Sequence, residues 1–286
     1  MKSSLDAVKR AYADEVGAAA NVTYQPIIEA FAAVPRERFL FAGPWRLPLP
    51  ATSGVEETPD DDPRHIYVDR LVTLDEAKNL NNGVPSFWAG LFEHLKPRPG
   101  ERVIHAGAGT GYYSAILAHL VGSGGSVLAI EYEPHLAAHA ARAFADQPNV
   151  EVVQGDALTR AHGEADVIVA SAGLDVVPLP WVGLLRDGGR LLVPLTAPAP
   201  RFGDRIGGGA MLLVTRRGPL YDARFVSGTF IYHFMGTRSP AASQRLAAAF
   251  ADASAAPVIA SLRLDDPPDE SAWLVGDGWW LSKAAV

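Results

Sequence analysis

Three glycines at alternate positions, Gly107, Gly109 and Gly111, follow a short apolar run over 103–106. Glycine has no Cβ, so the backbone can turn sharply here and come close to a bound molecule. The dinucleotide fingerprint G-x-G-x-x-G would place its third glycine at position 112, which is Tyr112. The spacing therefore argues against a pyrophosphate-binding dinucleotide site. It favours a cofactor with an adenosine and no phosphates, of which S-adenosylmethionine is the common one.

Acidic residues follow the next two predicted strands, where such a cofactor would need hydrogen-bond acceptors. The apolar run 126–130 ends at Glu131, about twenty residues after the glycines, where α/β nucleotide sites place the acid that binds the ribose. A strand predicted over 150–153 leads to Asp156 and Ala157, and this aspartate could accept the adenine amino group. There are plainer alternatives, since Glu131 could cap the following helix and Asp156 could lie in a turn. The ordered set of glycines and acids favours a cofactor site.

Neighbouring strands are needed to bring these residues together. Residues 85–235 alternate strand and helix patterns, including an apolar strand over 165–170, and this order is typical of a doubly wound parallel sheet. Residues 191–194 and 210–215 are predicted to be late strands joined by a glycine-rich hairpin turn. Apolar residues within 27–34 recur at helical spacing and predict a helix near the start of the chain.

Three segments outside these motifs carry a resemblance to a known family. Residues 30–39, Ala-Phe-Ala-Ala-Val-Pro-Arg-Glu-Arg-Phe, are similar to an N-terminal signature in which a helix ends at the proline. Residues 67–70 resemble a Tyr-x-Asp-Arg element, and residues 184–191 resemble a Leu-Leu-x-x-Gly-Gly-Arg-Leu segment. On these residues the chain resembles the class I methyltransferases and, within them, the protein-L-isoaspartate O-methyltransferases, over roughly residues 25–196.

The resemblance implies an α/β fold, a doubly wound (Rossmann-like) class I methyltransferase sheet with an N-terminal helical cover and a small C-terminal extension. It implies three parts: a helical segment with the acceptor-side loop over 1–84, the S-adenosylmethionine-binding domain over 85–237, and the extension over 238–286. The implied activity is methyl transfer from S-adenosylmethionine to a protein or peptide carboxylate. The residues expected to bind this cofactor are His105, Gly107, Gly109, Gly111, Glu131, Asp156 and Ala157.

His105 stands where many methyltransferases carry an acid beside the methionine portion of the cofactor. A strand residue that is merely hydrogen-bonded in place is the alternative. His135 and His139 are four residues apart on a predicted helix, but no third ligand is visible in the sequence, and no metal site is expected.

The family pattern is broken in the loop that faces the methyl acceptor. The family places an Ile-Ser-x-Pro segment before the first helix of the domain, and the serine hydroxyl lies near the acceptor carboxylate. If Pro85 is that proline, the serine position is Gly83, and a small insertion precedes it. The hydroxyl is then absent, and Asn81, Asn82 or Ser86 could supply a hydrogen bond instead. A plain turn over 81–83 is the alternative, because Asn and Gly favour φ > 0.

We take Asn82, Gly83 and Ser86 as the candidate catalytic positions. A carboxylate with a pKa near ~4 is already ionised at neutral pH, so its methylation needs no general base. The enzyme must position the oxygen and exclude water. An alcohol, phenol or amine acceptor would usually need a base, and no residue declares itself as one. A changed acceptor on the same scaffold and a non-catalytic cofactor-binding protein remain alternatives.

Composition narrows the function classes. The 286 residues carry a formal charge of −7 without a cluster of lysine or arginine, which disfavours a nucleic-acid partner. The chain has no cysteine, so disulfides and thiolate metal sites are excluded. No uncharged apolar run reaches the ~18 residues of a membrane span. The N-terminal residues lead into a charged amphipathic stretch, and a cytoplasmic location is the simplest expectation.

The last residues predict a helix over 241–251, a strand over 258–262, and a turn over 276–278 between two short strands. Trp279 and Trp280 beside that turn could stack on a ligand or a partner, and packing against the rest of the protein is the alternative.

Overall fold

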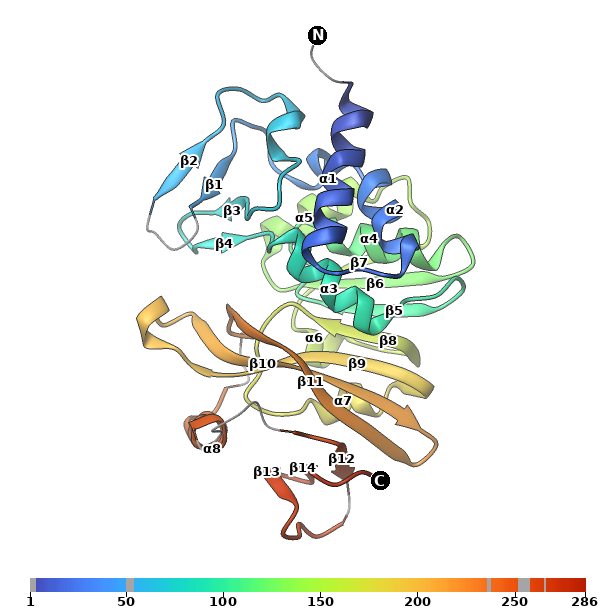
Figure 1. Ribbon diagram of the computed structural model, residues 1–286, viewed down its shortest axis with the longest axis vertical. Helices are drawn as coiled ribbons and strands as arrows, with labels where there is room; N and C mark the ends of the chain where they lie inside the picture. The colour runs from blue at the N-terminus through green and yellow to red at the C-terminus, as the bar shows by residue number, and fades with distance from the viewer. Residues whose placement is uncertain (1–3, 50–53, 236–237, 252–257, 265) are drawn as a thin grey trace. The chain divides into compact units, whose positions relative to one another are not determined.

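The computed structural model describes residues 4–49, 54–235, 238–251, 258–264 and 266–286 (Figure 1). The chain divides into two units. The first holds the described residues of Met1–Gly100, Ala108–Val127 and Glu133–Val152. The second holds those of Glu101–Gly107, Leu128–Tyr132 and Val153–Val286.

The first unit is largely helical. Its helices are α1 (Leu5–Ala19), α2 (Gln25–Ala33), α3 (Pro85–Leu95), α4 (Tyr112–Val121) and α5 (Pro134–Ala143), with the 3₁₀ turns η1 (Arg36–Phe39) and η2 (Pro63–Ile66). Proline in the first turn starts α2, α3 and α5, because it lacks only an N–H that would be unpaired there. The expected helix ends before Pro35, and its residues Ile27, Phe31 and Val34 are buried. No described helix of the chain has the length and apolar character needed to cross a membrane.

Short strands interrupt the stretch between η1 and α3. The pair β1 (Arg46–Pro48) and β2 (Val55–Glu57) is antiparallel, and so is the pair β3 (Thr73–Asp75) and β4 (Leu80–Asn81). Strands this short give no alternation to read in a sequence. The β3–β4 hairpin lies in the region where a small insertion is expected.

A ten-stranded sheet, most of which belongs to the second unit, has the strand order β13-β14-β12-β11-β10-β9-β8-β5-β6-β7. These strands are β5 (Arg102–Ala106), β6 (Ser126–Glu131), β7 (Val150–Gln154), β8 (Ala165–Ala170), β9 (Leu185–Pro198), β10 (Ile206–Arg217), β11 (Leu220–Tyr232), β12 (Ser261–Leu264), β13 (Ala272–Gly276) and β14 (Trp279–Ser282). Strand β8 pairs in parallel with β5 and β9, whereas β9, β10 and β11 form an antiparallel meander. The expected parallel α/β sheet and late hairpin are therefore present.

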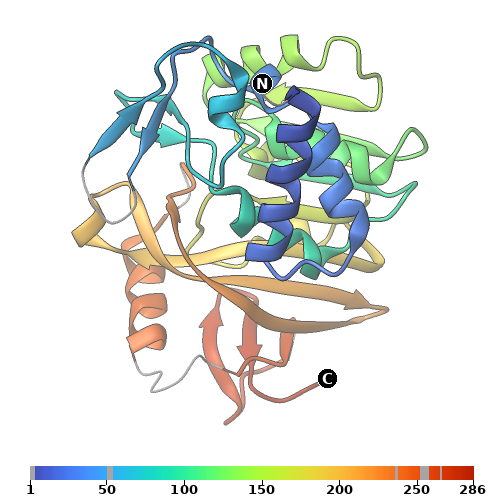
Figure 2. The same ribbon diagram turned by 45° about the horizontal axis from the view of Figure 1, so that its top comes forward.

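The remaining helices of the second unit are α6 (Ala157–Arg160), α7 (Leu179–Val182) and α8 (Pro240–Ala251), with the 3₁₀ turn η3 (Pro200–Phe202). Strands β12, β14 and β13 continue the sheet beyond β11 (Figures 1 and 2). Strand β12 begins three residues later than the sequence suggests. Trp279 and Trp280 are buried, and the Trp273 ring contacts Phe225 and Phe250. The tryptophans thus pack within this unit, as the plainer alternative held.

Candidate functional site

Hydrogen bonds between neighbouring segments join the ends of strands β5, β6 and β7. The Gly107 N–H, directly after β5, donates to the Ile130 carbonyl at 2.8 Å. The Gly155 N–H, directly after β7, donates to the Glu131 carbonyl at 2.9 Å. The carboxyl ends of three adjacent strands therefore meet at one edge of the sheet, which is where ligands bind in open α/β sheets.

His105 lies near the end of β5 and is almost fully buried, with 1% of its surface exposed. Its Nε2 lies 2.7 Å from the Ser171 hydroxyl, in the segment that follows β8. Burial lowers the pKa of His105 to about 4, so the ring is neutral at physiological pH. This contact agrees with the alternative named from the sequence, in which His105 is a strand residue held by a hydrogen bond.

Glu131 is the last residue of β6 and only 6% exposed. It does not cap the following helix, because the N-cap of α5 is Glu133. Asp156 does cap a helix, since its Oδ1 accepts the Leu158 N–H of α6 at 2.9 Å. Ala157 is buried, and its carbonyl accepts the Trp181 indole N–H. The second unit thus brings His105, Gly107, Glu131, Asp156 and Ala157 to its strand ends.

Gly109 and Gly111 belong to the first unit and lead into α4. Both have positive φ, +59° and +101°, a conformation that favours glycine. A Cβ on Gly111 would lie 2.6 Å from the Phe144 ring. Glycine is therefore required at position 111 by both the backbone and the neighbouring ring.

The acceptor-side loop is taken as residues 81–86, from the last residue of β4 to the first turn of α3, and it belongs to the first unit. The Asn82 Oδ1 accepts the Val72 N–H at 2.9 Å, and the Asn82 N–H donates to the Val72 carbonyl at 3.1 Å. The Gly83 carbonyl accepts the Tyr113 hydroxyl at 3.1 Å, and Gly83 has φ +75°. Gly83 therefore has the positive φ that the turn alternative expects, whereas the Asn82 side chain accepts a hydrogen bond from Val72.

Ser86 lies in the first turn of α3 and is half-buried. Its backbone N–H donates to the Asp69 Oδ1 at 2.7 Å, so Asp69 satisfies one of the donors that a helix start leaves unpaired. Asp69 belongs to the Tyr-x-Asp-Arg element. That element is therefore connected to the acceptor-side loop through one hydrogen bond to the start of α3.

Arg36 also binds the segment that contains this element, and it was not singled out from the sequence as a site residue. It is fully buried, and its guanidinium donates to three carbonyls within 66–70, at 2.6 Å to Ile66, 2.8 Å to Val68 and 2.8 Å to Arg70. The rings of Tyr12 and Tyr112 flank it at 5.8 and 5.7 Å. Only arginine offers this many donors in a fixed fork. Nothing in the sequence distinguishes Arg36 from the neighbouring charged residues Glu37 and Arg38.

The two helix histidines are engaged separately. The His135 Nε2 lies 3.1 Å from the Asp75 Oδ2, and the His139 ring contacts Phe41 edge-on. Burial lowers the pKa of His139. Among the described residues, one group, Asp60, Asp62 and His65, gathers three potential metal ligands, with Arg64 paired to Asp62 and His65 to Asp60.

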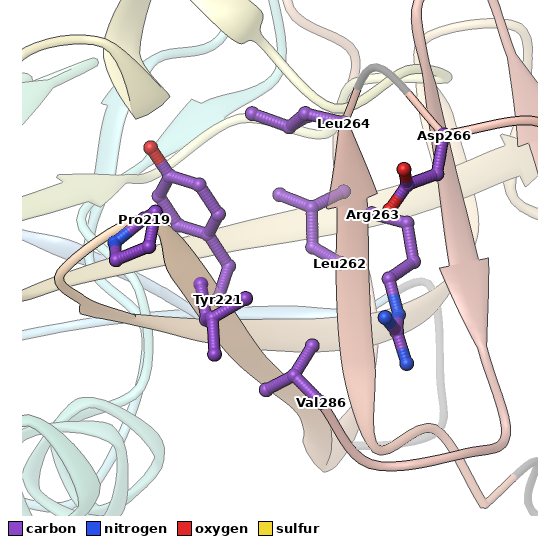
Figure 3. Close-up of a pocket in the computed structure, with 8 residues that line it drawn as sticks. Pro219, Tyr221, Leu262, Arg263, Leu264, Asp266 and Val286 are labelled. Carbon is purple, nitrogen blue, oxygen red and sulfur yellow. The ribbon is translucent and has the colours of Figure 1, made fainter.

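A small pocket of 160 Å³ lies at the start of β11, beside β12 (Figure 3). It contains none of the residues expected from sequence to bind the cofactor or the acceptor. Its volume is below the range of about 300–1,000 Å³ that is typical of small-molecule sites. It is lined by Pro219, Leu220, Tyr221, Leu262, Arg263, Leu264, Asp266 and Val286.

The family model described as protein-L-isoaspartate(D-aspartate) O-methyltransferase (PCMT) matches residues 59–201, half of the chain. The protein-L-isoaspartate O-methyltransferase of Aeropyrum pernix is 32% identical over 182 residues, 62% of each protein. That of Thermotoga maritima is 31% identical over 181 residues, 61% of this chain and 52% of that protein. The chain thus spans less than two thirds of these curated relatives.

Two solved structures have a similar fold. One, a protein-L-isoaspartate O-methyltransferase, has a TM-score of 0.61 at 25% identity, covering 78% of this chain and 66% of that one. The other is from Plasmodium falciparum, is named as a protein of the same type and is in complex with S-adenosyl-L-homocysteine. It has a TM-score of 0.61 at 14% identity and covers 80% of this chain and 99% of that one.

Proposed function

Because this chain belongs to the protein-L-isoaspartate O-methyltransferase family, we propose that it is an S-adenosylmethionine-dependent carboxyl O-methyltransferase that acts on isoaspartyl residues in proteins or peptides. The family match carries the proposal, since it includes both the acceptor-side loop and the strands that lead to the glycines and acids.

We assign the cofactor to the residues named from the sequence. Gly107, Gly109 and Gly111 would let the backbone approach it, Glu131 would accept the ribose hydroxyls, and Asp156 with Ala157 would meet the adenine. His105 would lie beside the methionine portion as a neutral ring. The buried Glu131 and the strand ends that meet around it support this assignment. When bound, S-adenosylmethionine would supply a methyl group activated by its sulfonium.

The acceptor would lie at the loop that contains Asn82, Gly83 and Ser86. An isoaspartyl carboxylate is ionised at neutral pH, so the residues of this loop have to bind and orient an oxygen and need not take up a proton. The loop fits that task because it offers hydrogen-bond donors and is anchored through Val72, Asp69 and Tyr113.

A second candidate is a methyltransferase on the same scaffold with another acceptor. It is favoured by one observation, the positive φ of Gly83, which stands at the position of the family's serine if Pro85 is the family's proline. The third possibility from the sequence, a cofactor-binding protein without catalysis, has no structural observation in its favour.

Methyl transfer from radiolabelled S-adenosylmethionine separates these functions. The acceptors are an isoaspartyl peptide and its normal aspartyl twin, and cofactor binding is titrated on the same sample. We expect base-labile label on the isoaspartyl peptide alone. Tight cofactor binding without transfer to either peptide would contradict the proposed acceptor and favour the second candidate. Absence of cofactor binding would contradict both.

The finer expectations on partners and location are also proposals. A protein or peptide carboxylate is the proposed substrate, with neither nucleic acid nor a membrane as a partner, and the formal charge of −7 supports the exclusion of nucleic acid. The proposed location is the cytoplasm, and cell fractionation with an antibody to the chain tests it.

A further inference from the structure

Position 83 is closed to any side chain. A Cβ built on Gly83 would lie 2.5 Å from the Trp88 Nε1, closer than real Cβ contacts, and 3.0 Å from its Cδ1, which is also tight. Trp88 is 3% exposed and packs against the Tyr113 ring with centroids 5.0 Å apart, so the indole has little room to move. The backbone adds a second obstacle, because φ +75° is strained for an L-residue. A serine hydroxyl has therefore no place here.

The neighbouring residue has a buried donor without a partner. Asn82 is 9% exposed, and its side-chain Nδ2 has no hydrogen-bond acceptor among the described residues. The amide cannot be reversed without loss, because its Oδ1 already accepts the Val72 N–H. The two N–H groups of Nδ2 are thus fixed as donors. A buried donor that lacks an acceptor destabilises a protein unless a ligand supplies one.

We propose that the Asn82 side-chain amide orients the methyl-accepting carboxylate, in place of the hydroxyl that Trp88 excludes from position 83. This inference rests on the proposed carboxyl methyltransferase function and names the residue that positions its substrate. A carboxylate oxygen is an acceptor only, so it can accept from a fixed amide donor, and a hydrogen bond with one ionised partner is stronger than one between neutral groups.

The two other candidates in the loop fit less well. The Asn81 Oδ1 accepts the Gly83 N–H at 2.9 Å, so this side chain closes the local turn. Ser86 is half-buried, and its backbone N–H is bound to Asp69. Asn82 combines burial, a fixed orientation and an unused donor.

The test is the Asn82→Asp variant, which keeps an oxygen for the Val72 N–H and replaces the donor with a carboxylate. We expect kcat/KM for the isoaspartyl peptide to fall about 10- to 100-fold, the range that a hydrogen bond to a charged group is worth. The Kd for S-adenosylmethionine should stay within about threefold of wild type. Asn21→Asp, the same change at an exposed asparagine of the first unit, is the matched control.

The pH profile separates orientation of the substrate from a structural role. Protonation turns the new carboxyl into a donor, so the ratio of variant to wild-type kcat/KM should rise as the pH falls from 8 towards 5. A ratio within threefold of one at every pH would overturn the inference. So would a lowered ratio that does not change with pH.

The wild-type protein supplies a readout that does not depend on how the variant folds. The Asn82 side-chain amide signals in a ¹H–¹⁵N spectrum should shift when the isoaspartyl peptide is added with S-adenosylhomocysteine present. Unchanged signals at saturating peptide would overturn the inference. Methylation of the isoaspartyl peptide by wild type reports on the proposed function separately, so transfer with unmoved Asn82 signals would refute the inference alone.

Discussion

Backbone hydrogen bonds join the strand ends of the second unit, whereas the Arg36 and Asp69 side chains fix residues 66–70 and the start of α3 in the first unit. Gly107 and Gly155 join strand ends through their own N–H groups. Residues 66–70 and the start of α3 depend on Arg36 and Asp69. A backbone hydrogen bond is kept when most side chains are replaced, because it does not depend on the residue type. A side-chain hydrogen bond is lost when its residue is replaced. Substitutions on the acceptor side should therefore lower stability more than substitutions at the strand ends. They should also alter the shape of the acceptor side more readily.

The largest expected effect tests the anchors of the first unit. Arg36→Met removes the donors to the Ile66, Val68 and Arg70 carbonyls, and each buried acceptor left unpaired costs about 1–3 kcal/mol. We expect the free energy of unfolding in urea to fall by about 4 kcal/mol. Arg10→Ala, which removes an exposed pair with Asp14, should leave the free energy of unfolding nearly unchanged, because solvent screens surface ion pairs. If Arg36→Met and Arg10→Ala lowered the free energy of unfolding equally, side-chain anchors would not distinguish the first unit.

The next effect concerns the second unit and depends on pH. The pKa of His105 is about 4 because the ring is buried, against about 6.5 in the unfolded chain. Between these two pH values the unfolded state binds more protons than the folded state. The contribution of His105 to stability is therefore complete above pH 6.5 and is lost as the pH falls to 4. We expect about 3 kcal/mol of decline from this group. His105→Gln should not show this decline in stability, and a wild-type pH dependence in that variant would refute the assignment. His119→Gln, at an exposed position of α4, is the control and should keep the decline.

A glycine pair sharpens the account of position 83. Gly83→Ala should lower the free energy of unfolding by about 2–4 kcal/mol, from positive φ and from overlap with Trp88. Gly100→Ala has a similar φ of +85° and no atom within 4 Å of its Cβ, so it should show the backbone cost alone. The difference in unfolding midpoint in urea measures the overlap. If the two variants were equally stable, Trp88 would not close position 83.

The smallest effect lies in another side-chain anchor of the first unit. Burial acts to raise the pKa of Glu93, but hydrogen bonds from Thr23, Tyr24 and Lys96 outweigh it and lower the pKa to about 2. This contribution is present above the unfolded pKa of about 4.3 and is lost as the pH falls towards 2. Glu93→Gln should cost about 1 kcal/mol at pH 7, with the difference from wild type vanishing over that window in acid unfolding. A difference that persisted at pH 2 would argue against an ionised anchor.

The sequence predicted the sheet better than the loops because the two carry different signals. Apolar runs such as 126–130 and 165–170 mark buried strands, and β6 and β8 lie where they were expected. Strand β9 runs through Gly188 and Gly189, although paired glycines usually indicate a turn, so it is longer than the sequence suggested.

The candidate site was predicted in part. Glycine at position 83 is visible in the sequence, but the Trp88 indole that fills the space beside it is not. Arg36 contacts carbonyls that lie 30 or more residues away, and no local pattern encodes such a contact. The cofactor-side residues stay predictions, with Asp156 shown to cap α6.

A crystal structure of the wild-type protein with S-adenosylhomocysteine and an isoaspartyl peptide tests the central claim most directly. We predict the cofactor product at Glu131 and the strand ends, and the isoaspartyl carboxylate within hydrogen-bonding distance of the Asn82 Nδ2, with Trp88 still beside Gly83. A carboxylate bound elsewhere, with Asn82 Nδ2 unpaired, would contradict the claim that this loop holds the acceptor.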